Sequence, residues 1–203
     1  MTKIFERALA FVRELSERFC RKINERLFSD EKIAALIRES LDTHLSSGNE
    51  LDSGVNIEYN IIEDFSPEDT ALVEEQEKGS TAGELLATTS LYEADDYYIV
   101  FALKPMKNLA FKFPPWRAKK EIQDIAKHEA FHVRQYHFIC KEGGMEAIDR
   151  LTNYMSTVDY NDNIFELGAY LYQWFDEKHD FATDFDPFIH PENYPEEVEQ
   201  SAA

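Results

Sequence analysis

The stretch His128-Glu129-Ala130-Phe131-His132 lies within residues 119–140, where apolar side chains recur with the period of an α-helix. Two histidines four residues apart lie on the same face of such a helix, one turn above the other. A glutamate directly after the first histidine completes the arrangement that zinc hydrolases use, in which the imidazoles hold the metal and the carboxylate takes a proton from water. The pattern therefore predicts a zinc site with His128 and His132 as ligands and Glu129 as the general base.

The phase of this helix places Glu129 in the middle of an apolar stripe, with the two histidines at its edge. A buried carboxylate costs several kcal/mol unless it is paired or protonated. The alternative to a metal site is a glutamate satisfied by a buried arginine or by tyrosine hydroxyls, beside two histidines that are hydrogen-bonded in the core. The stripe consists of Ile122, Ile125, Ala126, Val133, Tyr136 and Ile139, and the opposite side carries Gln123, Lys127 and Arg134.

A third ligand is expected from the helix predicted at residues 163–177. This segment is apolar almost all round, which predicts burial, and its polar side chains Glu166 and Gln173 share a face. A lone carboxylate in a buried helix needs a partner, and we predict that Glu166 is the third metal ligand. The alternative partner is Arg150, through a salt bridge. Glu146 and Asp149 are rival candidates for the third ligand, but they follow the Gly143-Gly144 turn too closely to reach back easily.

The periodicities predict an α+β fold, with a small sheet beside a helical half and two helices before it. We expect three parts: an N-terminal helical segment (1–48), a central domain (49–178) and a loosely attached acidic tail (179–203). The strand at 97–103 is expected to line a cleft, where an extended peptide could add to its edge. Helices are predicted at 3–28, 31–45, 119–140 and near 145–155, strands at 55–61, 85–91 and 97–103, and a loop at 111–116.

Composition excludes several classes of function. The 203 residues carry a formal net charge of −19, which argues against nucleic-acid and anionic-membrane partners because both require clustered Lys and Arg. Residues 1–28 contain Arg and Glu every few positions, so we expect neither a signal peptide nor a transmembrane span there. Cys20 and Cys140, far apart in the sequence, are expected to be reduced thiols in a cytoplasmic protein. The oligomeric state is left open.

At this point the chain resembles the gluzincin metallopeptidases. The resemblance covers about residues 95–178 and rests on His128-Glu129-x-x-His132 and, 34 residues later, on Glu166 in Asn163-x-x-Glu166-x-x-Ala169. It implies a zincin-like fold with a mostly antiparallel sheet and a helical half. It further implies one Zn²⁺ per chain, bound by His128, His132 and Glu166, with Glu129 as general base in the hydrolysis of a peptide or protein substrate.

The chain departs from that family at two points. Many gluzincins place an aspartate near the third ligand to orient a histidine, whereas Ala169 and Tyr170 occupy the following turn here. The residue that stabilises the oxyanion is also not identified by the sequence. The residues that stay open for this role are Tyr154, Tyr160, Tyr170, His137 and His179.

Other functions remain open. The zinc site could serve folding or partner binding without catalysis. Glu129-x-x-His132 also matches the motif of di-iron helical bundles, but these need a second Glu-x-x-His, and no other histidine here follows a glutamate at that spacing. Finally, the long N-terminal helix and the acidic surface could belong to an adaptor or to a mimic of nucleic-acid charge.

Overall fold

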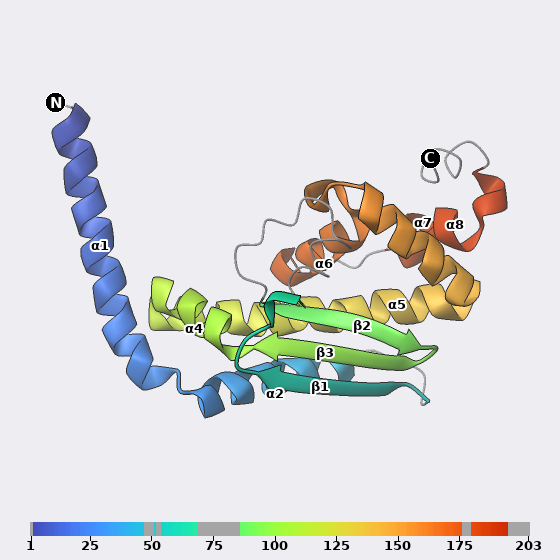
Figure 1. Cartoon of the computed structure of the whole chain (residues 1–203), viewed down its shortest axis with the longest axis horizontal. Coiled ribbons are helices and arrows are strands. Elements are labelled where there is room, and N and C mark those ends of the chain that lie inside the picture. The colour runs from blue at the N-terminus through green and yellow to red at the C-terminus, as the bar shows by residue number, and fades with distance from the viewer. Residues whose placement is uncertain (1, 47–50, 52–53, 69–85, 176–179, 195–203) are drawn as a thin grey trace.

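The computed structural model describes residues 2–46, 51, 54–68, 86–175 and 180–194 (Figure 1). It confirms the α+β class, with one small sheet and mostly helical structure around it. None of the helices described is both long and apolar enough to cross a membrane. The elements are α1 (Thr2–Leu27), α2 (Asp30–Ser46), β1 (Asn56–Ile62), β2 (Ala87–Glu93), β3 (Asp96–Ala102), α4 (Leu103–Lys112), α5 (Pro115–Thr157), α6 (Ile164–Phe175), α7 (Phe181–Asp184) and α8 (Asp186–Ile189), with 3₁₀ turns at Tyr160–Asp162 and Pro191–Asn193.

The three strands form a mixed sheet in the order β1-β3-β2. β2 and β3 form a hairpin, and their two-residue connection is typical of an antiparallel pair. β1 lies on the other side of β3 and runs parallel to it, with Ile57 opposite Tyr97, so the expectation of a mostly antiparallel sheet is wrong. Because β3 is the central strand, it has no free edge for a peptide. In the part of the chain described, the edges belong to β1 and β2.

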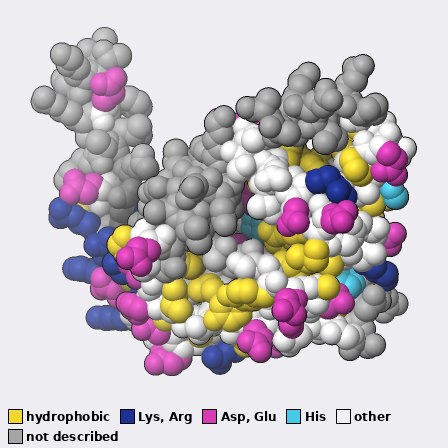
Figure 2. Space-filling view, turned by 45° about the vertical axis from the view of Figure 1, so that its right-hand side comes forward, with side chains coloured by type: hydrophobic (Ala, Val, Ile, Leu, Met, Phe, Trp, Pro, Cys, Tyr) yellow, Lys and Arg dark blue, Asp and Glu magenta, His cyan; other side chains and the backbone are white. Residues whose placement is uncertain are grey.

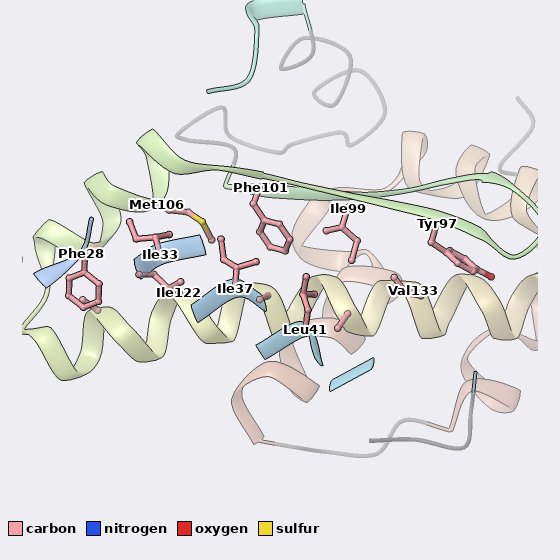
Figure 3. Packing of buried hydrophobic residues seen from close by; sticks show 14 residues of the cluster. Phe28, Ile33, Ile37, Leu41, Tyr97, Ile99, Phe101, Met106, Ile122 and Val133 are labelled. Atoms are coloured by element: carbon pink, nitrogen blue, oxygen red, sulfur yellow. The ribbon is translucent and has the colours of Figure 1, made fainter. Parts of the chain in front are cut away.

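The main hydrophobic core lies between one face of the sheet and the helices α2, α4 and α5 (Figure 3). Alternation along β3 turns Tyr97, Ile99 and Phe101 toward this core, and all three are almost fully buried. Helical spacing places the buried side chains of α2 and α5 on the facing sides of these helices. The core residues contributed by helices include Ile33, Ile37, Leu41, Met106, Ala110, Ala118, Ile122, Ala126, Ala130 and Val133. α2 therefore shares its core with the sheet, while the three-part division of the chain stays a prediction.

Prolines lie at the starts of two helices, and one of them, Pro115, belongs to the loop predicted at 111–116. Pro105 lies in the first turn of α4, and Pro115 is the first residue of α5. Proline is tolerated at these positions because the first N–H groups of a helix have no intrahelical acceptor. The loop predicted at 111–116 is therefore shorter than expected, since only Phe113 and Pro114 separate the two helices.

The long helix α5 is broken at Gly144, as the Gly-Gly pair predicted. Gly144 has φ 67° and ψ −172°, a conformation that is essentially confined to glycine. Gly143 permits close packing, since a Cβ there would lie 3.2 Å from Ile189 Cα of α8. The second segment of α5 forms a smaller core with Phe165 and with Phe185, which is 1% exposed. The expectation of a loosely attached tail is thus wrong for residues 180–194, because a buried aromatic side chain anchors them to α5.

The helix α1 projects away from the rest of the chain (Figure 1). Its C-terminal part is attached through Asn24, whose amide donates hydrogen bonds to the carbonyl groups of Ala110 and Phe113. Basic side chains are concentrated on this part of the surface, whereas acidic side chains are scattered over the face shown in Figure 2. The exposed basic residues near the end of α1 are Arg18, Arg21, Lys22 and Arg26.

Candidate metal centre

The structure brings together the three side chains that the sequence analysis selected as metal ligands. His128 and His132 come from consecutive turns of α5, and Glu166 comes from the first turn of α6. Asn163 sets the start of α6, since its side-chain oxygen accepts a hydrogen bond from the backbone N–H of Phe165 at 3.0 Å. This N-cap places Glu166 at the third helical position. Ala169, one turn later, is fully buried, and its small side chain lets α6 lie close to α5.

The donor atoms of these residues converge. The Nε2 atoms of His128 and His132 lie 2.9 Å apart, and each lies 3.3 Å from one oxygen of Glu166. One donor atom from each residue can be chosen so that all three lie within 4.8 Å of one another. All three side chains are buried, with exposed fractions of 5–9%. Two imidazoles and a carboxylate are a donor set that suits zinc, so the residues present fit this metal.

Without a metal, the group is held together by charge. Burial alone would lower the pKa of His132, but the Glu166 carboxylate outweighs this and raises it to about 9. Burial likewise favours a neutral Glu166, but His132 and His128 hold the pKa of this carboxyl well below its usual range. At neutral pH the metal-free site therefore contains a cationic His132 beside an anionic Glu166. A bound divalent cation would take the place of that imidazolium proton.

Glu129 is also buried, and it faces the sheet. Its Oε2 accepts a hydrogen bond of 2.7 Å from the hydroxyl of Thr89, a residue of the edge strand β2. The helix phase thus correctly placed Glu129 in a buried face, and a strand hydroxyl compensates its carboxylate. Sequence reasoning missed Thr89, because nothing in the sequence indicates which strand residue faces the motif helix.

The burial predicted from the helix phase was wrong on the side of α5 opposite the apolar stripe. Lys127 and Arg134, expected to face away from the core, are 7% and 8% exposed. Both contact Tyr172 of α6, since Lys127 Nζ lies 4.6 Å from the centre of its ring and Arg134 lies near its hydroxyl. Residues 126–135 of α5 are consequently buried on all sides, which a single amphipathic stripe does not predict.

α6 is less buried than its composition predicted. Leu167, Trp174 and Phe175 are 48–65% exposed, because only one face of the helix packs against α5. Glu166 and Gln173 do share that face, as predicted. Arg150 is not the partner of Glu166, because its guanidinium donates to the carbonyl oxygen of Phe188 instead.

Tyr160 and Tyr170 are the oxyanion candidates that lie at the ligands. The Tyr160 hydroxyl donates to Glu166 Oε2 at 2.8 Å and lies 3.0 Å from the hydroxyl of Tyr170, whose ring centre lies 4.7 Å from that of His128. Burial, followed by the charge of Glu166, raises the pKa of Tyr160, so its hydroxyl keeps its proton. His137 instead pairs with Asp95, and Tyr154 packs against Phe188. The remaining candidate, His179, lies outside the described residues.

Comparisons with known proteins add no assignment: no family model matches the chain, and neither curated proteins nor solved structures give a significant match.

Proposed function

We propose that this protein is a zinc-dependent metallopeptidase of zincin-like type, in which His128, His132 and Glu166 hold one Zn²⁺. The observation that carries the proposal is the convergence of these three buried side chains, from two helices, on one point. In the part of the chain described, this is the one group of three or more potential ligands. Three donors match a single zinc with one open coordination position better than a di-iron centre, which draws ligands from four helices.

When bound, zinc would supply a Lewis acid that activates water and polarises the carbonyl group of a substrate. Glu129 lies next to His128 in the chain and is the carboxylate that we assign to proton transfer. Its Oε2 accepts a hydrogen bond from the Thr89 hydroxyl, and this bond fixes the carboxylate to which we assign the transfer of a proton from water to the leaving amine. Tyr160 carries the protonated hydroxyl that we assign to the oxyanion, to which it would donate in place of Glu166 Oε2.

The position of β2 supports a peptide as the substrate. β2 forms an edge of the described sheet, and its residue Thr89 contacts Glu129. An extended peptide that added to this edge through backbone hydrogen bonds would run past the proposed general base. This replaces the expectation that the peptide adds to the strand at 97–103.

The test is the conversion of Glu129 to Gln, which keeps the shape of the side chain but removes its basicity. Wild type and variant are incubated with a mixed peptide library and the products are identified by mass spectrometry. We expect Glu129→Gln to retain zinc and to lose about 10²- to 10⁴-fold in cleavage rate. Glu142→Gln, an exposed change on the same helix, should leave the rate unchanged.

Two results would contradict this proposal. Cleavage by Glu129→Gln at the wild-type rate would exclude Glu129 as the base. A wild-type protein that holds zinc but cleaves no peptide in the library would favour the alternative function, a non-catalytic zinc-binding module. The burial of all three ligands is the observation that favours this alternative, since structural zinc sites are closed to solvent.

A further inference from the structure

Each of the three proposed ligands is held by a different neutral side chain. The two histidines are held at Nδ1, the nitrogen that does not face the other ligands, and Glu166 is held at Oε2, the oxygen that also faces His128. His132 Nδ1 lies 2.8 Å from Gln135 Oε1, and His128 Nδ1 lies 3.2 Å from Gln173 Oε1. Glu166 Oε2 accepts the hydroxyl of Tyr160 at 2.8 Å. We propose that Gln135, Gln173 and Tyr160 are positioning residues that orient the ligands for a divalent cation without adding charge. This inference rests on the metal site proposed above.

The hydrogen bonds of Gln135 determine which nitrogen of His132 can bind a metal. The amide NH₂ of Gln135 donates to the carbonyl oxygen of Phe165 at 2.8 Å, and a carbonyl can only accept. The amide oxygen must therefore point to His132, and it requires a proton on Nδ1. In the neutral imidazole the lone pair is then on Nε2, the atom that faces His128 and Glu166.

Gln173, from α6, holds Nδ1 of His128 with its side-chain oxygen, as Gln135 holds Nδ1 of His132. It lies two turns after Glu166 on the same face of α6, so the helix that supplies the third ligand also orients the first. Gln173 is 9% exposed and Gln135 is 1% exposed. Because neither amide is open to water, each hydrogen bond to a ligand has little competition from solvent.

The absence of charge in these three partners has a chemical consequence. Metal-bound histidines commonly donate to a carboxylate, which adds negative charge and raises the basicity of the ligand. Here Glu166 and Glu129 already place two buried carboxylates near the histidines. Because Gln135, Gln173 and Tyr160 are neutral, they add no further charge to this group. The amide and phenol side chains therefore orient the proposed ligands without changing the charge of the site.

The experiment measures zinc affinity by competition with a chromogenic chelator, so it does not depend on catalysis. We expect Gln135→Leu, Gln173→Leu and Tyr160→Phe each to weaken zinc binding about 10- to 100-fold. Gln135→Glu keeps an acceptor for His132 Nδ1 but loses the donor to the carbonyl oxygen of Phe165, so it should bind zinc more tightly than Gln135→Leu and less tightly than the wild type. Tyr154→Phe, which removes a hydroxyl bonded to the carbonyl of Asp162, is the matched control and should bind like the wild type.

The outcomes distinguish a failure of the positioning role from a failure of the metal site itself. If the wild type binds zinc and both Gln173→Leu and Tyr160→Phe bind it equally well, the positioning role is wrong and the metal site stands. If the wild type binds no zinc, both proposals fail together. Tyr160→Phe removes a single half-buried oxygen, so it keeps the test decisive even if Gln135→Leu does not fold.

Discussion

Thr89 Oγ1 lies 2.7 Å from Glu129 Oε2, so the edge strand β2 is hydrogen-bonded directly to the carboxylate of the motif helix. The same hydroxyl lies 3.3 Å from the backbone carbonyl oxygen of Glu129. One strand residue thereby fixes both the side chain and the turn of helix that carries the two histidines. This contact connects the sheet, and with it a candidate substrate edge, to the proposed general base.

Replacement of Thr89 by Val tests this contact, since valine has almost the same shape and no hydroxyl. The buried carboxylate of Glu129 would lose its donor, and we expect the free energy of unfolding to fall by about 1–3 kcal/mol. Urea denaturation measures the change, and zinc stoichiometry should stay the same because Thr89 contacts none of the proposed ligands. Thr88→Val, on the opposite face of β2, is the control. Equal stabilities of the two variants would contradict a specific role for the Thr89 hydroxyl.

The break in α5 predicts a second effect on stability. Gly144 has φ 67° and ψ −172°, and we expect Gly144→Ala to lower the free energy of unfolding by about 1–3 kcal/mol. Gly54→Ala is a suitable control, because a Cβ at Gly54 would meet no atom within 4 Å and its φ lies outside the left-handed range. Denaturant unfolding should show little loss for that variant. A similar loss for both glycines would indicate that the conformation of Gly144 is not the cause.

The pH dependence of the metal-free protein should reflect His132. Its pKa rises from an ordinary value of 6.5 to about 9 in the folded state, chiefly because the charge of Glu166 outweighs the effect of burial. The folded state therefore keeps a proton that the unfolded state releases, and this contribution to stability is complete below pH 6.5 and is lost as the pH rises through 9. We expect the free energy of unfolding to fall over this interval, as measured by urea titrations at several pH values.

Saturating zinc supplies the control for this pH effect. A metal ligand must be a neutral imidazole, so zinc binding at pH 7.5 should release about one proton and remove the dependence on pH between 6.5 and 9. Proton release can be followed with an indicator dye in weak buffer. Zinc binding without proton release would show that His132 is not the cationic group of the metal-free site.

The sequence predicted those parts of the site that depend on local spacing. His128, Glu129 and His132 share a helix, so a period of 3.6 residues was enough to place the two histidines together and to bury the glutamate. Glu166 was selected because a carboxylate is conspicuous in an apolar helix. Gln173 was identified on the same face as Glu166, but its hydrogen bond to His128 depends on the docking of α6 on α5, which no local pattern specifies.

The sequence-based predictions that failed concern the long-range arrangement of the strands and the structure around prolines. Strand 97–103 was recognised, but its central position in the sheet depends on β1 pairing parallel to it, which follows from the path of the chain and not from the alternation of its residues. Pro114 and Pro115 suggested a loop at 111–116, although Pro115 begins a helix, where proline is tolerated. The acidic composition after residue 179 concealed the burial of Phe185, since one anchoring aromatic side chain hardly changes the composition.

The metal content of the purified protein is the most direct test of the proposed zinc site. Protein prepared without chelators is analysed by inductively coupled plasma mass spectrometry, together with Glu166→Ala and the control Glu146→Ala, an exposed glutamate outside the ligand group. We expect about one zinc per chain in the wild type and in Glu146→Ala, and a large loss in Glu166→Ala. A wild-type protein that contains no zinc and takes up none when zinc is added would contradict the proposed zinc site, as would two iron ions per chain.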